Sequence, residues 1–314
     1  MTNPTHHHSK HYRNGFLLAL ATVIIWSGNY VVARGISQKI PPISMAFFRW
    51  GTACIFIIPL GLKKFLAEKE IILQHKTYLF FTALFGISLF NTFIYLAGHY
   101  TAAINLALIG TTASPVFITI LSAFFLKERI YNLRVIGMIL CIVGIMMLLS
   151  NGDIEKLKQL QFGKGEYFIL CSAIAFSIYN ILVKKRPSKI SPISLLFVIF
   201  IVGTIMLFPF SMLELHYYPT LHFTQGMYAT IIYLGIGNSV IGFLFWNASI
   251  ARIGAARTSL FGNLLPLFTV IEAVIFLGEK FTLMHVISGF VIVAGLTIAN
   301  IQTKKQIAVS NNKS

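Results

Sequence analysis

The sequence predicts an all-α integral membrane protein with ten transmembrane helices in two inverted five-helix repeats. Of its 314 residues, 56% are hydrophobic and 11% are charged, whereas an ordinary soluble domain is about 25% charged. The apolar residues form runs long enough to cross a bilayer, and the second half of the chain repeats motifs of the first. These three observations exclude a soluble protein.

Ten apolar runs separated by short charged connections are the expected spans, because a bilayer core about 30 Å thick requires roughly 20 helical residues. They lie near residues 15–36, 43–62, 77–97, 103–126, 132–150, 166–184, 191–212, 227–249, 256–278 and 283–301. The longest connections, 63–76, 151–165 and 214–226, are too short for a soluble catalytic domain. The chain also lacks a P-loop, which argues against an ATP-driven pump.

The two ends of the chain are expected to be short tails, 1–14 and 302–314. The first apolar run follows Lys10 and Arg13 as a leader peptide would, but it lacks an A-x-A site and precedes many further spans, so a retained helix is expected. His6 to His8 and His11 lie in the polar N-terminal tail, for which we expect disorder and no metal site.

No chemistry of an enzyme is visible in the sequence. Cys54, Cys141 and Cys171 lie inside apolar runs without metal-ligand spacing and are interpreted as core residues. No Ser/His/Asp set, paired carboxylates or metal-ligand cluster stands out, so we expect neither an active site nor a cofactor.

The basic residues predict the orientation. With a cytoplasmic N-terminus, 18 Lys and Arg residues fall on the inner side and six on the outer side. Because cytoplasmic loops carry an excess of basic residues, both termini are expected in the cytoplasm. The net charge of +16 is therefore interpreted as a topology signal in a cytoplasmic membrane of bacterial type, not as nucleic-acid binding.

The repeat is visible when the chain is shifted by half its length. A shift of 150 residues places Lys39-Ile-Pro-Pro-Ile-Ser over Lys189-Ile-Ser-Pro-Ile-Ser, and a shift of 151 places Pro115 over Pro266. The expected repeats are 15–150 and 151–301. An odd number of spans in each makes the second repeat inverted, as in many secondary transporters, whose two halves expose one midplane site alternately to each side.

These motifs resemble those of the EamA family of the drug/metabolite transporter superfamily. The resemblance rests on Trp26-Ser-Gly-Asn29 with Arg34, Pro42 with Phe47-Phe48-Arg49, Ser114-Pro115-Val-Phe with Leu126-Lys-Glu-Arg129, and Leu277-Gly-Glu-Lys280. Two departures are Lys127, where the family prefers Gly, and the sixth span, which lacks the Trp-Gly pair. The resemblance implies transport of small metabolites, often amino acids or related amphipathic compounds and commonly outward.

Polar and aromatic side chains within the spans are expected to face a common cavity, because polar groups are costly in hydrocarbon. The candidate substrate-binding residues are Trp26, Asn29, Tyr30, Asn91, Tyr95, Thr112, Ser114, Ser177, Tyr179, Asn180, Asn238, Trp246 and Asn263. Amides, hydroxyls and rings suit a ligand with an apolar body and a zwitterionic or cationic head. The alternative is that these side chains join helices or mark the membrane interface.

Prolines and charges add four further candidates. Pro115 and Pro266 are expected inside their spans, as hinges with freed carbonyls or as static kinks. Arg49 and Glu272 each lie roughly 9 Å below the outer boundary, counted at 1.5 Å per residue. They are expected to form an ion pair at an outer gate, or Glu272 to take up a proton. The alternative is that Arg49 snorkels outward and Glu272 contacts a neighbouring helix.

Two acidic-basic pairs, Glu128-Arg129 and Glu279-Lys280, are expected to position turns or to cap neighbouring helices. The predicted function is a secondary transporter of a small organic metabolite that rocks about a midplane site between the first, third, fourth, sixth, eighth and ninth spans. Alternatives are a carrier for nucleotide-type or methylated compounds such as S-adenosylmethionine, a channel, a lipid scramblase or a membrane scaffold. We expect a monomer as the functional unit, with a dimer as the alternative.

Overall fold

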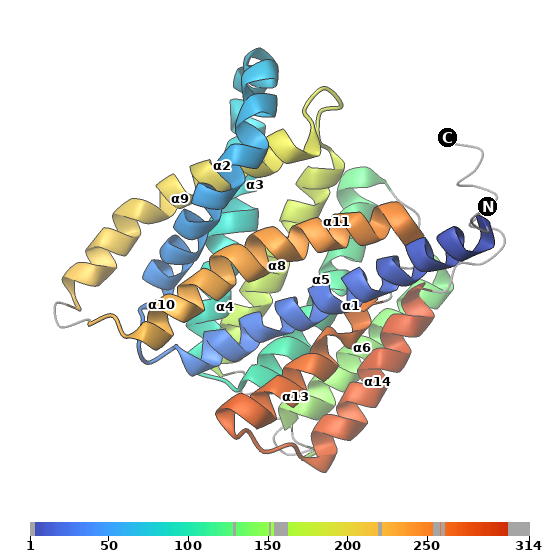
Figure 1. The fold of residues 1–314 in the computed structure, drawn as a ribbon. Coiled ribbons are helices and arrows are strands. Elements are labelled where there is room, and N and C mark those ends of the chain that lie inside the picture. The colour runs from blue at the N-terminus through green and yellow to red at the C-terminus, as the bar shows by residue number, and fades with distance from the viewer. Residues whose placement is uncertain are drawn as a thin grey trace.

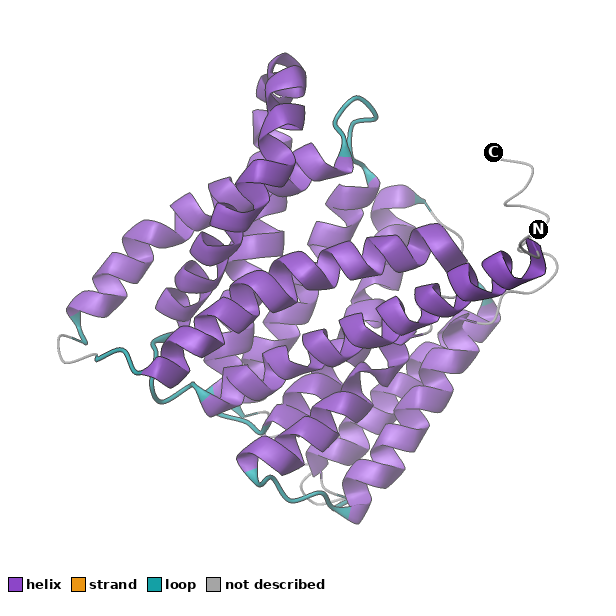
Figure 2. Cartoon of the chain, in the orientation of Figure 1, coloured by secondary structure: helices purple, strands orange, loops and turns teal. Residues whose placement is uncertain are grey.

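The computed structural model describes residues 4–127, 130–150, 152–153, 163–218, 222–253, 258 and 261–300. Over these residues every regular element is a helix (Figure 2). The first half contains α1 (Pro4–Gly35), α2 (Pro42–Gln74), α3 (Lys76–Ala83), η1 (Leu84–Leu89), α4 (Phe90–Gly98), α5 (Ala103–Leu126) and α6 (Asn132–Ser150). The second half contains α8 (Lys164–Lys184), α9 (Pro192–His216), α10 (Gln225–Ile232), η2 (Tyr233–Ile241), α11 (Gly242–Ile253), η3 (Gly262–Leu264), α13 (Leu265–Leu277) and α14 (Leu283–Asn300).

The ten expected spans are all present in the described part of the chain. Seven helices are long and apolar enough to cross a membrane, and three shorter apolar helices cover 132–148, 262–277 and 283–299. Two of the seven are composite, because α3, η1 and α4 form one span and α10, η2 and α11 form another.

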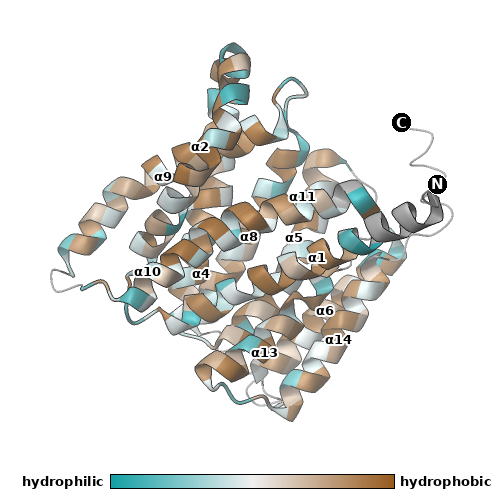
Figure 3. Ribbon diagram, in the orientation of Figure 1, coloured by the Kyte–Doolittle hydropathy of each residue, from teal (hydrophilic) through white to brown (hydrophobic). Residues whose placement is uncertain are grey.

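Three helices extend beyond the limits that hydropathy predicts. Helix α2 continues from residue 62 to Gln74, and its polar end projects from the bundle (Figure 3). The extension is rich in Lys, Glu and Leu, which favour helix in water. Helix α9 likewise continues to His216, and α1 begins at Pro4, so the prediction of a disordered tail that includes His6 to His8 and His11 is wrong.

The helices pack with a pseudo-two-fold relation between the halves. Exchanging the halves converts the contact of α5 with α8 into that of α13 with α1, and the contact of α4 with α8 into that of α11 with α1; all four occur. The remaining major contacts, α2 with α9 and α6 with α14, pair each helix with its own counterpart (Figure 1). We call the end at which α2, α5, α8, α11 and α14 terminate the inner end, and the opposite end the outer end.

Glutamates cap helix N-termini across the two halves. Glu214 accepts hydrogen bonds from the backbone N–H groups of Ile43 (3.2 Å) and Ser44 (2.6 Å) at the start of α2. Glu68 of α2 accepts one from the N–H of Ser191 (2.8 Å) at the start of α9. Because the first N–H groups of a helix have no intrahelical partner and attract negative charge, these contacts fix the α2–α9 pair at both ends.

Glu279 caps α5 in the same way. Its carboxylate accepts hydrogen bonds from the N–H groups of Ala103 (2.8 Å) and Ile104 (3.2 Å). The capping role expected for this turn is confirmed for Glu279, while its repeat counterpart Glu128, together with Arg129, lies outside the described residues.

Candidate functional site

Arg49 is the centre of a buried hydrogen-bond cluster that joins four helices. Its side chain is only 4% exposed. Nε donates to Ser239 Oγ (2.9 Å) and Nη2 to Asn238 Oδ1 (2.7 Å), while Nη1 contacts Asn29 Oδ1 (2.7 Å), Asn91 Oδ1 (2.8 Å) and the Tyr95 hydroxyl (3.0 Å). We call these six residues the Arg49 cluster.

The local structure of each helix brings these groups together. Asn91 and Tyr95 are four residues apart and share one face of α4. Asn238 and Ser239 lie in η2, a π-helical segment that matches η1 in the other half. Such segments break the α-helical register and are frequent at functional sites. Here η2 allows two consecutive side chains to reach the same guanidinium.

Arg49 has only neutral partners among the described residues. It does not pair with Glu272, whose Oε1 lies 2.6 Å from Ser27 Oγ, and the expected ion pair is therefore wrong. Arg49 also does not snorkel outward, because it is buried. A buried charge is tolerated where hydrogen bonds replace its hydration, and amide and hydroxyl oxygens do this for Arg49.

Trp26 supports the cluster from α1. Its Nε1 donates to the backbone carbonyl of Asn238 (3.1 Å), and its ring lies 5.1 Å from Trp246 and 5.7 Å from Phe243, measured between centroids. The Asn238 side chain in turn donates from Nδ2 to the Ile25 carbonyl (2.9 Å). Two consecutive residues of α1 thus hold Asn238 in place.

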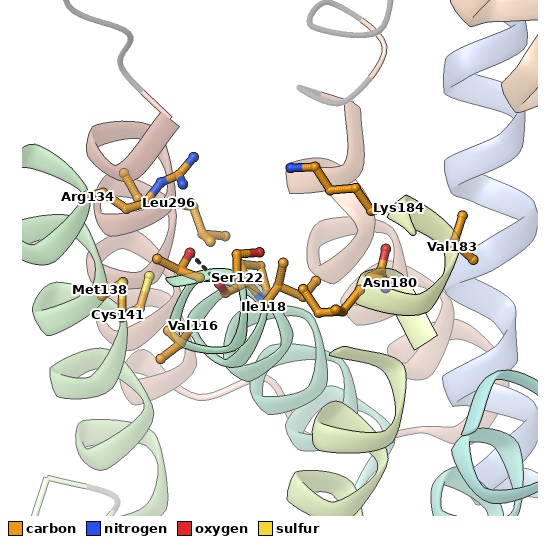
Figure 4. Close-up of a pocket in the computed structure, with 14 residues that line it drawn as sticks. Val116, Ile118, Ser122, Arg134, Met138, Cys141, Asn180, Val183, Lys184 and Leu296 are labelled. Carbon is orange, nitrogen blue, oxygen red and sulfur yellow. Dashed lines mark hydrogen bonds between the residues drawn. The ribbon is translucent and has the colours of Figure 1, made fainter. Parts of the chain in front are cut away.

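A cavity of about 470 Å³ opens at the inner end between α5, α6, α8 and α14 (Figure 4). Arg134 and Lys184 lie on two sides of it, with Ser122 between them and Asn180 on the side of Lys184 (Figure 4). Pro115, inside α5, also lines it. We call this the inner cavity.

A second opening of about 580 Å³ lies at the outer end between α1, α10, η2 and α13. It is lined mostly by apolar side chains, with Glu272 and Tyr233 within it and Lys39 from the loop after α1. We call this the outer groove. The inner cavity lies against α5 and α8, and the outer groove against their repeat counterparts α13 and α1.

The other predicted binding residues do not line either opening. Thr112 and Ser114 donate to carbonyls one turn back in α5, and Ser177 donates to the Ala173 carbonyl with Ser114 O 3.1 Å away. Tyr30 is buried, with its hydroxyl near Gly110 of α5. Thr112 and Ser114 thus bond within α5, whereas Ser177 contacts α5 from α8 and Tyr30 packs against it from α1.

The remaining predicted residues are placed as follows. Tyr179 packs on Phe176 and against Gly86, and Asn263 lies in the short turn η3. Pro266 is at the start of α13, so its expected position inside a helix is wrong. Proline is well accommodated there, because the first N–H groups of a helix have no acceptor in any case.

Sequence reasoning missed three polar residues around these sites: Ser239, Ser27 and Tyr233. Ser239 follows the predicted Asn238 directly, and Ser27 precedes the Gly28-Asn29 pair. Tyr233 donates its hydroxyl hydrogen to the Ile25 carbonyl (2.6 Å). The two serines could have been recognised because each lies next to predicted residues, whereas no sequence pattern indicated Tyr233.

Comparison with known proteins agrees with this architecture. The model of the EamA-like transporter family matches residues 13–150 and again 163–301. The uncharacterized transporter YyaM of Bacillus subtilis is 26% identical, over 94% of this chain and 99% of its own. A probable amino-acid metabolite efflux pump of Salmonella typhimurium is 24% identical, over 91% and 94%.

A solved crystal structure is similar in fold, with a TM-score of 0.61 and 16% identity, over 91% of this chain and 96% of the other. Both halves match the family model separately, as the internal repeat predicts. The chain therefore belongs to the EamA-like transporter family, with two EamA domains in one integral membrane protein.

Proposed function

We propose that this transporter exports a small organic metabolite, an amino acid or a related amphipathic compound, by alternating access. The observation that carries the proposal is the pairing of the two openings. The inner cavity lies against α5 and α8, and the outer groove lies against α13 and α1, which are the same helices after exchange of the repeats. Rocking of inverted repeats interconverts two such pathways.

In this mechanism the Arg49 cluster is the outer gate. Arg49 is seven residues from the start of α2, about 10 Å below the outer end at 1.5 Å per residue. Its partners Asn238 and Ser239 belong to the second repeat, and Asn29 and Asn91 belong to the first. Opening the outer end separates the two sets, so the hydrogen bonds to Asn238 and Ser239 stabilise the inward-open state.

The inner cavity supports a substrate with a carboxylate. Arg134 and Lys184 contribute positive charge, and a guanidinium binds carboxylates with paired hydrogen bonds. Asn180 adds an amide, while Met138 and Val116 add apolar surface. A compound with an anionic group and an apolar body fits this lining, and the name of the Salmonella relative points the same way. The excess of basic residues on the inner side supports a cytoplasmic location of this end.

The test is counterflow in proteoliposomes that contain the purified full chain. Labelled amino acids are compared with nucleosides and S-adenosylmethionine; saturable uptake accelerated by internal unlabelled amino acid is expected. Asn180→Ala is expected to lower it, and Asn132→Ala, an exposed Asn at the start of α6, is the matched control. Uptake of S-adenosylmethionine alone would replace the amino acid as substrate. Unsaturable flux would favour a channel or scramblase, and no flux of any compound would favour a scaffold.

A further inference from the structure

We propose that Glu272 is a proton-binding site of the transport cycle, protonated in this conformation and open to the outer solution through the outer groove. This inference rests on the proposed transport function and assigns it a coupling ion. It concerns a half-buried carboxyl group whose hydrogen bond is to the Ser27 hydroxyl and not to a cation.

The contacts of Ser27 favour a proton on Glu272. Ser27 Oγ lies 2.7 Å from the Ile24 carbonyl oxygen and 2.6 Å from Glu272 Oε1. Both distances are typical of full O–H···O hydrogen bonds. A serine hydroxyl has one hydrogen, and a carbonyl oxygen only accepts. If Ser27 donates to Ile24, a protonated Glu272 that donates to Ser27 Oγ gives each of the two contacts its own hydrogen, whereas an ionised Glu272 would have to share the one hydrogen of Ser27.

The surroundings of Glu272 favour the same neutral form. Arg49 directs all of its hydrogen bonds to the neutral members of its cluster. Lys39 lies beyond the end of α1 at Gly35, which is about 12 Å along the helix from Ser27. An ionised carboxylate without a partner is costly in an apolar environment. Among the described residues, Glu272 therefore makes no hydrogen bond or ion pair with a cation that would hold it in the ionised form.

The remaining titratable group that faces Glu272 is Tyr233 of η2, which lines the same groove. Its hydrogen is donated to the Ile25 carbonyl, so it presents an oxygen and no positive charge. Glu272 is half-buried, and the groove extends from it to the exposed residues Lys39 and Thr224. This groove is the route by which the proton passes from the carboxyl group to outer water.

Deprotonation would act on the outer gate through α1. Once the proton has moved from Glu272 to water, the Ser27 hydrogen turns from the Ile24 carbonyl to the carboxylate. The next carbonyl, that of Ile25, holds Asn238 of the Arg49 cluster. Loss of the proton thus changes the hydrogen bonding of the Ile24 carbonyl, which is adjacent to the Ile25 carbonyl that positions Asn238. The charge of Glu272 thereby affects the outer gate.

Infrared difference spectroscopy of the purified protein tests the protonation state without any substrate. Wild type at pH 7 is expected to show the C=O stretch of a protonated carboxyl group that Glu272→Gln lacks. Glu70→Gln, at an exposed position of α2, should retain it and is the matched control. The band is expected to vanish reversibly on alkalinisation. Absence of a Glu272-dependent band at pH 7, or a band that no alkaline pH removes, would overturn the proposal.

Transport provides the second measurement. With whichever compound shows counterflow, wild type is expected to respond steeply to the outer pH and Glu272→Gln to lose that response. A Glu272→Gln variant with unchanged pH dependence overturns the coupling role while leaving the transport function intact. Failure of all compounds to show counterflow would reject the transport function instead, and the infrared result would still decide whether Glu272 binds a proton.

Discussion

Replacing Arg49 with Lys tests the outer gate most directly. The guanidinium of Arg49 makes five hydrogen-bond contacts, whereas a lysine ammonium has three donors. Only the contacts with Ser239 and Asn238 cross between the repeats, and they use two separate nitrogens, Nε and Nη2. We expect a single lysine nitrogen to lose both of these hydrogen bonds while the positive charge is kept. At about 1.5 kcal/mol for each hydrogen bond to a charged group, the closed gate loses about 3 kcal/mol. Because 1.4 kcal/mol is tenfold, the open population rises about 100-fold.

The assay is cysteine labelling from the outer side. Thr52 of α2 packs against Gly235 at the contact of α2 with η2, one turn deeper than Arg49. Thr52 is half-buried. In a background with the three native cysteines replaced by Ala, Thr52→Cys is expected to react faster with a membrane-impermeant maleimide when this contact opens. The labelling rate reports the open population when reclosing is faster than labelling. Arg49→Lys is expected to raise this rate about 100-fold.

Two further variants make the result interpretable. Ser239→Ala removes one hydrogen bond and keeps Arg49, so it is expected to raise the labelling rate about tenfold, equivalent to about 1.5 kcal/mol. Arg34→Lys changes the same residue type at an exposed position of α1 outside the cluster and should leave the rate unchanged. A folded Arg49→Lys protein that labels at the wild-type rate would refute the gate.

Two other predictions concern stability, measured by thermal unfolding in one detergent. Gly28→Ala places a Cβ against the Tyr233 hydroxyl and is expected to lower the free energy of unfolding by about 1 to 3 kcal/mol through overpacking. In the control Gly51→Ala the added Cβ meets open space, so this variant should be neutral or stabilising. Equal shifts of the unfolding temperature in the two variants would contradict the packing. Glu279→Gln keeps one of the two acceptor oxygens that cap α5 and is expected to lower the free energy of unfolding by about 1 kcal/mol. Glu70→Gln is the control and should be unaffected. If Glu279→Gln lost no stability, the cap would contribute nothing.

The positions of the spans are predictable because hydropathy is a local property of the sequence. The span predicted at 103–126 coincides with α5, and that at 132–150 with α6. The second helix was predicted to end at residue 62, because hydropathy reports the apolar part of a helix and not its full length. Residues 63–74 continue the helix beyond the apolar part. The π-helical segments were not predicted, because backbone register depends on contacts with neighbouring helices and not on apolar spacing.

Part of the candidate site was also predictable from the sequence, because polar side chains within apolar spans are easily recognised. Asn29, Asn91 and Asn238 do converge, as polar groups in a membrane should. Their common partner, the Arg49 guanidinium, was not predictable from the spacing of residues. Counting residues placed Arg49 and Glu272 at equal depth, but depth does not specify on which side of a helix bundle a residue lies. The two side chains are at similar heights and have different partners.

The neutral partners of Arg49 suit a gate that must open repeatedly. Two unit charges 4 Å apart attract by about 4 kcal/mol at an effective dielectric constant of 20, and separating a buried ion pair leaves two charges to be hydrated. Separating Arg49 from its neutral partners leaves only one charge to be hydrated. The amide and hydroxyl oxygens of Asn238 and Ser239 are readily hydrated by the water that enters. An Arg49–Glu272 pair would hold the outer end closed more strongly and would also fix Glu272 in its ionised form. In the mechanism we propose, keeping the two apart leaves Arg49 to close the gate and Glu272 to exchange a proton.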